Sequence, residues 1–231
     1  SVLVVVIVLA IVNPAAVVEE YSDTKLVREY TKKTEYLPVD HEKIGKIVKD
    51  TVKWETNPYL QAKLLFTYLR ETMEYSDFVP SSSVIDALDF NKADSYTYAL
   101  LYTTMLRRAG IPARVNSGHI IYGDKKTRQH FWNEFYLNDF GWVPVDIALA
   151  DGAEFEDLPF IENPEQFYFG NIDNQHICTG KGEIHTIQIK PDNRIVQRDD
   201  LYPLMGCHEE LSSGIQSYRT EWQKMRIIEW W

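Results

Sequence analysis

The fold is decided by residues 91–118, N-K-A-D-S-Y-T-Y-A-L-L-Y-T-T-M-L-R-R-A-G-I-P-A-R-V-N-S-G. Asp94 suits the N-cap position of a helix, and apolar residues then recur at helical spacing. Gly110 stands where a left-handed cap would end that helix, and Pro112 prevents its continuation. We therefore predict a helix that begins at Ser95 and is followed directly by a strand.

Ser95 occupies the first turn of this predicted helix. The helix dipole and the unpaired N–H groups of a first turn favour a developing negative charge on a side chain there. Taken alone, a serine at a helix start is ordinary. A nucleophile-type residue at the start of an otherwise buried helix is nevertheless a simple way to build a reactive site.

Residues 93–115 resemble the core motif of the transglutaminase-like superfamily, relatives of the papain-like thiol proteases. Two further segments follow in that family's order. H-F-W-N-E at 130–134 is similar to its His-x-Trp-x-Glu segment, and G-W-V-P-V-D at 141–146 is similar to its Gly-Trp-x-Pro-x-Asp segment. The flanks 26–38 and 167–173 are similar to bacterial and archaeal members. Three ordered motifs make this a specific match.

The resemblance implies a Cys-His-Asp triad at positions 95, 130 and 146. His130 and Asp146 agree with it, whereas position 95 holds Ser95. It also implies acyl transfer from a peptide-type amide to water or an amine. Trp132 and Trp142 are expected in the core or in the wall of a substrate site. We further expect Asp146 to orient the imidazole, so that Asp146→Asn leaves the fold intact.

The replacement of sulfur by oxygen has a chemical consequence. In the family's usual arrangement a thiolate attacks a carbonyl carbon while His carries the proton. A helix N-terminus and a protonated His lower a thiol pKa from about 8.5 into the neutral range. A serine hydroxyl begins several pK units higher and requires general-base removal of its proton. We therefore expect Ser95 to be a weak nucleophile or none as it stands.

Three explanations of Ser95 stay open. The site has decayed into a pseudoenzyme that binds peptide or a glycan-linked amide, or Ser95 works in a Ser-His-Asp hydrolase, or a Cys was deliberately changed to Ser. Ala93, where the family usually has Gly, favours natural drift. A non-catalytic interaction module is the competing class of function. A flat sheet face instead of a cleft at Ser95 would mark that module.

The remaining sequence predicts helices before the central one and strands after it. The predicted helices cover 41–53 behind an Asp40 cap, from Pro58 behind Asn57 to about Glu74, and a short turn through Leu88 capped by Ser83 or Asp86. The predicted strands cover 111–115, 119–122, 129–137 and 142–147, with turns at 116–118, 123–126 and 138–141. Turns this short join antiparallel neighbours, so the helix should pack on an antiparallel sheet. His130 and Asp146 then fall on adjacent strands, where side chains on one face can meet.

We interpret the chain as a single α+β domain with a transglutaminase-like or papain-like core. Its parts are an N-terminal strand or trimmed signal remnant at 1–20, a catalytic-type core at 40–150 and a C-terminal β-rich layer at 160–231. The apolar run 2–12 is predicted as a buried strand, with a signal-peptide remnant as the alternative. In the C-terminal layer, a short helix should open at Pro164, the clearest strand covers 183–190, and residues 216–231 fit either a strand or a helix.

Composition restricts the partners. A net charge of −10 argues against nucleic acid and anionic membrane surfaces, which need a basic footprint. No segment is long enough to span a bilayer. We expect a peptide or protein substrate, with cell-wall peptide as one form of it. Export or the cell envelope is favoured over the cytoplasm, and the oligomeric state stays open.

No cofactor or metal is expected. No acidic loop carries a calcium-binding pattern. His176-Ile177-Cys178 with Cys207-His208 offers zinc-type side chains but lacks the usual ligand spacing. The two cysteines fit either a disulfide or two free thiols, and they leave the compartment open.

Overall fold

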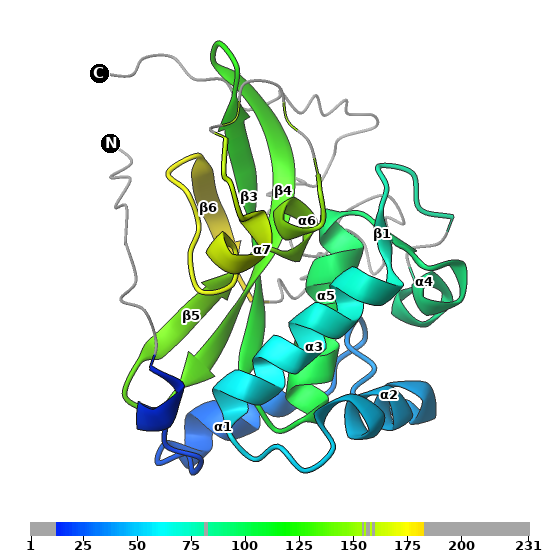
Figure 1. Cartoon of the computed structure of the whole chain (residues 1–231). Coiled ribbons are helices and arrows are strands. Elements are labelled where there is room, and N and C mark those ends of the chain that lie inside the picture. Colours follow the sequence, from blue (N-terminus) through cyan, green and yellow to red (C-terminus); the bar gives the residue numbers. More distant parts are fainter. Residues whose placement is uncertain (1–12, 81–82, 154, 156–157, 159, 183–231) are drawn as a thin grey trace, which may run out of the picture.

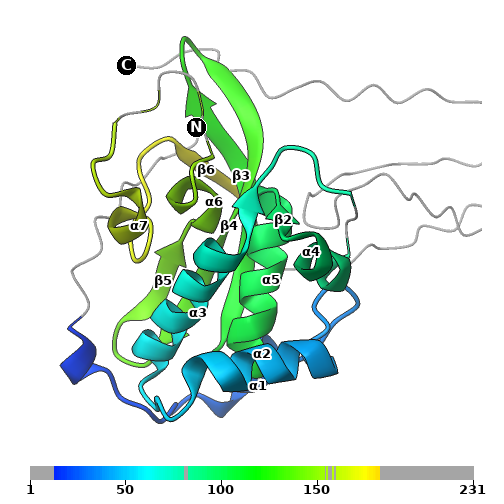
Figure 2. The same ribbon diagram turned by 45° about the vertical axis from the view of Figure 1, so that its right-hand side comes forward.

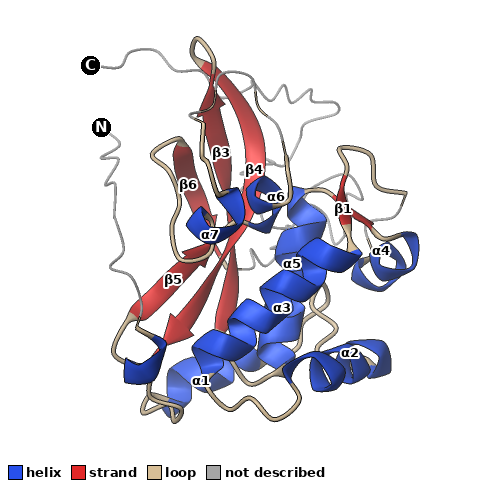
Figure 3. Cartoon of the chain, viewed as in Figure 1, coloured by secondary structure: helices blue, strands red, loops and turns tan. Residues whose placement is uncertain are grey.

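The computed structural model of the 231-residue chain describes residues 13–80, 83–153, 155, 158 and 160–182. A four-stranded antiparallel sheet is covered on one side by helices (Figure 1), and Figure 3 separates the two kinds of element by colour. The predicted α+β class, with a central helix packed on an antiparallel sheet, is confirmed.

The described helices are η1 (Pro14–Ala16), α1 (Thr24–Thr31), α2 (Glu42–Val52), α3 (Pro58–Thr72), α4 (Val84–Phe90), α5 (Ser95–Arg108), α6 (Ile147–Ala150) and α7 (Pro164–Phe167). The described strands are β1 (Glu74–Tyr75), β2 (Lys92–Ala93), β3 (Ala113–Tyr122), β4 (Lys126–Leu137), β5 (Gly141–Val145) and β6 (His176–Lys181). The main sheet has the order β5-β4-β3-β6, while β1 and β2 form a separate parallel pair. None of the helices among these residues is long and apolar enough to cross a membrane.

α5 is the central element, as the sequence predicts. The Asp94 side chain caps it by accepting from the Thr97 N–H at 2.8 Å, and Gly110 beyond its end has a φ of +84°. Residues 96–107 are all buried, so the helix is covered on every side. The reason is its place between the sheet and α2, α3, α4 and α6 (Figure 2).

Of the helices before α5, α2, α3 and α4 follow the predicted pattern with two shifts, whereas η1 and α1 were not predicted. α2 begins after His41, whose Nδ1 accepts from the Lys43 N–H, and Asp40 instead forms an ion pair with Lys33. α3 ends at Thr72, since the chain then enters β1. The predicted caps at Asn57 and Ser83 are confirmed, because each side chain accepts from a backbone N–H of the following helix.

The predicted turn at residues 116–118 is wrong, because β3 continues through it. Gly118 serves a close strand approach instead. A Cβ placed on Gly118 would lie 1.9 Å from the Ile177 carbonyl oxygen in β6, where the β3–β6 register also shifts. A glycine inside a strand marks either a turn or such a contact, and the contact applies here.

The strand predicted over 142–147 ends earlier, at Val145, because Asp146 begins the short helix α6. The described part of the predicted C-terminal layer contains the strand β6 and the short helix α7, which begins at Pro164 as predicted. The elements predicted at 2–12, 183–190 and 216–231 lie outside the described residues. The division of the chain into one domain with three parts stays a prediction.

Candidate active site

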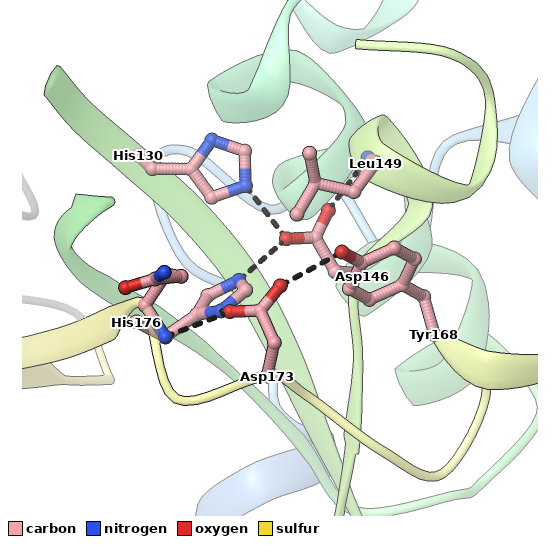
Figure 4. Close-up of polar contacts among 7 residues, drawn as sticks. His130, Asp146, Leu149, Tyr168, Asp173 and His176 are labelled. Atoms are coloured by element: carbon pink, nitrogen blue, oxygen red, sulfur yellow. Dashed lines mark hydrogen bonds and ion pairs between the residues drawn. The ribbon is translucent and has the colours of Figure 1, made fainter. Parts of the chain in front are cut away.

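His130 and Asp146 meet in the interior, as the motif order implies. His130 lies in β4, and Asp146 directly follows the neighbouring strand β5. The His130 Nε2 atom is 2.6 Å from the Asp146 Oδ2 atom (Figure 4), and the two side chains are 1% and 0% exposed. Such a short contact to a carboxylate is a charge-assisted hydrogen bond.

This contact fixes the tautomer of His130. An ionised carboxylate only accepts hydrogen bonds, so Nε2 carries the hydrogen and donates it to Asp146. The lone pair of a neutral His130 then lies on Nδ1. That atom is on the side of the ring turned away from Asp146 (Figure 4), where it is able to accept a proton.

Asp146 also holds the local backbone. Its Oδ1 atom accepts from the Leu149 N–H at 3.0 Å and so caps α6, while its own N–H donates to the Tyr168 carbonyl oxygen at 2.9 Å. The expectation that Asp146 serves imidazole orientation alone is therefore too narrow. The same carboxylate is a buried cap, and this fixes the direction in which Oδ2 faces His130.

A second histidine reaches the same oxygen. The His176 Nε2 atom lies 2.9 Å from Asp146 Oδ2, and its Nδ1 atom lies 2.8 Å from Asp173 Oδ1. The Tyr168 hydroxyl donates to the other oxygen of Asp173 at 2.8 Å. From the sequence, His176 is expected only as a zinc-type residue, and Asp173 and Tyr168 have no expected role in the site.

The proton count of His176 follows from these partners. Both of its nitrogens face carboxylate oxygens, Asp146 on one side and Asp173 on the other (Figure 4). Ionised carboxylates accept only, so both nitrogens must donate and the ring is a buried imidazolium. A buried charge of this kind is tolerated because it is paired on both sides.

The pKa directions agree with this assignment. Burial lowers the pKa of His176, but the hydrogen bonds and charges of Asp146 and Asp173 outweigh it and raise that pKa to about 9. Burial raises the pKa of Asp146, yet the charge and hydrogen bonds of the two histidines hold it well below the ordinary value. The pKa of Asp173 is lowered in the same way, since the His176 contact outweighs its burial.

Ser95 stands at the first position of α5 and is half-buried. The next residue, Tyr96, packs edge-on against Phe131 of β4, with ring centroids 5.0 Å apart. Phe131 in turn follows His130. This contact sets the start of α5 beside the part of β4 that carries His130, but no hydrogen bond joins Ser95 to His130 in the described part of the chain.

The two tryptophans proposed for a substrate site lie in different surroundings. Trp132 is 2% exposed, and its ring lies 6.4 Å from that of His130 and 5.1 Å from that of His176. Trp142 is at the far end of β5 from Asp146, under the guanidinium of Arg114. A substrate contact at either tryptophan stays a prediction.

Glu134, the last residue of the His-x-Trp-x-Glu segment, ties three strands together. Arg114 of β3 lies 2.6 Å from its carboxylate, and Lys181 of β6 lies 3.1 Å from it. Because β6 also carries His176, this ion-pair group helps to hold the second histidine against the sheet.

The one set of metal-ligand side chains that converges among the described residues is His130, Asp146 and His176, whose ligand atoms lie within 4.8 Å of one another. The two contacts at 2.6 and 2.9 Å have hydrogen-bond lengths. Ligands at about 2.1 Å from a tetrahedral zinc would be about 3.4 Å apart. The spacing thus fits hydrogen bonds. Cys178 is exposed, and Cys207 and His208 lie outside the described residues.

Sequence comparison supports the motif match. Residues 45–147 match the sequence model of the Transglutaminase-like superfamily. No curated protein sequence matches the chain significantly.

Solved structures give weaker likenesses. One is a protein from Cytophaga hutchinsonii that is provisionally named a cysteine protease, at 16% identity and a TM-score of 0.48, over 69% of this chain and 63% of that one. Another is the periplasmic domain of TgpA from Pseudomonas aeruginosa, at 20% identity and a TM-score of 0.44, over 54% of this chain and 47% of that one. Both alignments span less than two thirds of the solved chain, at 63% and 47%. The matched segment 45–147 contains Ser95, His130 and Asp146.

Proposed function

We propose that this site performs acyl transfer from a peptide-type amide, with residue 95 as the nucleophile, His130 as the proton carrier and Asp146 as the group that orients it. The observation that carries the proposal is the buried 2.6 Å contact between His130 and Asp146 beside the start of α5. It leaves Nδ1 of His130 as the basic nitrogen, as an acyl-transfer base requires.

The reaction balances in two steps. The hydroxyl of Ser95, or the thiol of a cysteine in its place, gives its proton to His130 Nδ1 while its oxygen or sulfur bonds to the carbonyl carbon. The amide C–N bond then breaks, and His130 returns the proton to the leaving amine. Water or a second amine next attacks the acyl-enzyme, His130 takes the proton of that acceptor, and the nucleophile recovers it on release.

The residue at position 95 sets the rate. The N-terminus of α5 and a protonated His130 favour a thiolate, because a thiol pKa needs to fall by only one or two units to reach neutral pH. They cannot ionise a hydroxyl in the ground state. The Ser95 form is accordingly a weak acyltransferase or an inactive one, and the cysteine form is the working enzyme of this geometry.

A peptide or protein is the substrate class that this reaction requires, and the peptide part of a cell wall meets it. An exported or envelope protein would meet such a substrate. Two alternatives make different use of the same geometry. A Ser-His-Asp hydrolase would use Ser95 directly, and a pseudoenzyme would bind peptide without turning it over.

Two chemical probes separate these functions. A fluorophosphonate forms a covalent bond only to an activated serine, and iodoacetamide alkylates thiolates. We expect no phosphonate adduct on Ser95 but rapid alkylation of the Ser95→Cys variant, each located by peptide mass spectrometry. A phosphonate adduct at Ser95 would establish the serine hydrolase. If neither probe reacts, the pseudoenzyme or binding module is the correct function.

A further inference from the structure

We infer that His176, held by Asp173, is a positioning residue that acts on His130 through Asp146, sharing the Asp146 charge and so lowering the affinity of His130 for a proton. The inference rests on the proposed function for its catalytic meaning. Its structural content is independent of that function, because it concerns the coupling between two buried rings.

The two histidines share one carboxylate oxygen. Asp146 Oδ2 accepts from His130 at 2.6 Å and from His176 at 2.9 Å, and both histidine side chains are 1% exposed or less. One carboxylate therefore serves two imidazoles in a region without solvent. A charge on either imidazole ring therefore changes the proton affinity of the other ring, because both rings bind the same oxygen.

His176 carries a positive charge. Asp173 occupies its Nδ1 side at 2.8 Å, so the ring donates at both nitrogens and is an imidazolium. Asp173 is held in place in turn by the Tyr168 hydroxyl and by the Gln175 N–H at 2.9 Å. The Asp173 carboxylate thus keeps His176 as an imidazolium beside Asp146 over the neutral pH range.

The size of the effect on His130 follows from the distance between the two rings. The ring centroids of His130 and His176 are 5.7 Å apart. A unit charge at that distance, at an effective dielectric constant of about 20, changes the proton affinity of a neighbour by about one to two pH units. With Asp146 alone, His130 would hold its proton more tightly, so that less of it would be neutral at pH 7 with a free lone pair on Nδ1 to accept a proton from a nucleophile.

Among the described groups around the two rings, Asp146 and His176 have the main influence on the proton affinity of His130. The described side chains that face His130 are Asp146, His176 and the uncharged rings of Trp132 and Phe155. Arg128, two residues before His130 in β4, is partly buried, pairs with Asp77 and lies over the Phe155 ring at 5.3 Å. The His176 ring meets Asp146, Asp173, Tyr168, Trp132 and His130.

The test follows the imidazole rings by long-range ¹H–¹⁵N NMR across pH 5 to 10, in the full chain with Ser95 in place and after dialysis against EDTA. Variants of His130 and His176 to Gln assign the two rings. We expect His176 doubly protonated at pH 7, and His130 with its hydrogen on Nε2 when neutral. In His176→Gln, the pH at which His130 titrates should rise by about one to two units.

A second variant keeps the His176 ring in place. Asp173→Asn should lower the pH at which His176 loses its second proton and, above that pH, raise the proton affinity of His130. Asp151→Asn is the matched control. Asp151 also accepts from a tyrosine hydroxyl, of Tyr98, and from a backbone N–H, of Tyr75, but it contacts no histidine. It should leave both titrations unchanged.

Three results would overturn the inference. They are a neutral His176 at pH 7, a His130 titration that stays fixed in both His176→Gln and Asp173→Asn, and a change of either ring on EDTA treatment, which would show a bound metal instead. None of these depends on catalysis. Failure of thiol activation at position 95 with the coupling intact would refute the proposed function and leave this inference standing.

Discussion

Tyr96 packs edge-on against Phe131, with ring centroids 5.0 Å apart, and each of them directly follows a residue of the candidate site. The contact joins the start of α5 to β4 and so sets how Ser95 stands relative to His130. Both rings are buried, at 6% and 4% exposure. The aromatic pair therefore serves both the core and the geometry of the site.

Phe131→Leu should remove the ring contact with Tyr96 while keeping an apolar side chain in its place. We expect a loss of about 1 kcal/mol in the free energy of unfolding, typical of an apolar exchange in a packed core. In a Ser95→Cys background the alkylation rate at neutral pH should also fall, because the thiol and His130 are held less well. Phe66→Leu, also buried but in α3, is the control and should cost stability alone. Equal alkylation rates in the two variants would show that the Tyr96–Phe131 contact does not align the site.

Asp146→Asn should destabilise the protein by about 3 kcal/mol in urea unfolding at pH 7. An amide still caps Leu149, but it removes the anion between two histidines and leaves the His176 charge with one partner. Asp23→Asn is the matched change, since Asp23 is an exposed helix cap and Asn caps about as well as Asp. That control should stay within about 0.5 kcal/mol. Equal effects of the two substitutions would mean that Asp146 is no more than a cap.

The stability of the protein should decline in mild alkali because of His176. Its folded-state pKa of about 9 is above the ordinary 6.5, so its contribution is complete below about pH 6.5 and is lost as the pH rises through 9. The shift corresponds to a contribution on the order of 3 kcal/mol. Asp146 has the opposite sign, because its pKa is lowered, and its contribution is lost only in acid below the ordinary carboxyl range.

Urea midpoints between pH 6 and 10 measure this decline. His176→Gln should flatten it. His119→Gln should not, because burial lowers the pKa of His119 and so gives that residue the reverse pH dependence. An alkaline decline that persists unchanged in His176→Gln would assign it to another group.

Gly118→Ala should separate β6 from β3. The added Cβ would meet the Ile177 carbonyl oxygen at 1.9 Å, and backbone atoms cannot move aside as a flexible side chain does. We expect a loss of at least about 2 kcal/mol. Gly45→Ala is the control, since there the nearest atom is the flexible end of Arg108 and alanine favours the helix by about 1 kcal/mol. A Gly118→Ala protein as stable as the Gly45→Ala protein would refute the close-approach explanation of Gly118.

The sequence predicts most of the frame of the site because the relevant signals are local. Asp94 and Gly110 bound α5 through capping chemistry, and two short turns set the antiparallel pairing that joins His130 to Asp146. The turn predicted at 116–118 failed because a glycine inside a strand has two meanings, and spacing alone does not distinguish them.

His176 shows the limit of such reasoning. It lies 30 residues after Asp146, and its approach depends on the pairing of β6 with β3 across an irregular segment. No periodicity within the sequence reports that pairing. Its two carboxylate partners were visible as aspartates, but only the fold reveals that they face the same ring.

The central claim is that the surroundings of position 95 activate a nucleophile through His130. The most direct test is the pH dependence of iodoacetamide alkylation of Ser95→Cys, with Cys178 and Cys207 changed to Ser. Thr24→Cys in the same background is the matched control. Thr24 likewise follows an Asp cap at the first position of a helix, α1, but is exposed.

We expect the Ser95→Cys thiol to titrate at least one unit below the ordinary value of about 8.5, and further below the Thr24→Cys thiol than a helix N-terminus alone explains. Adding His130→Ala should raise its titration to that of Thr24→Cys. If Ser95→Cys and Thr24→Cys titrate together, and His130→Ala changes neither, then His130 does not activate residue 95 and the account of the site is wrong.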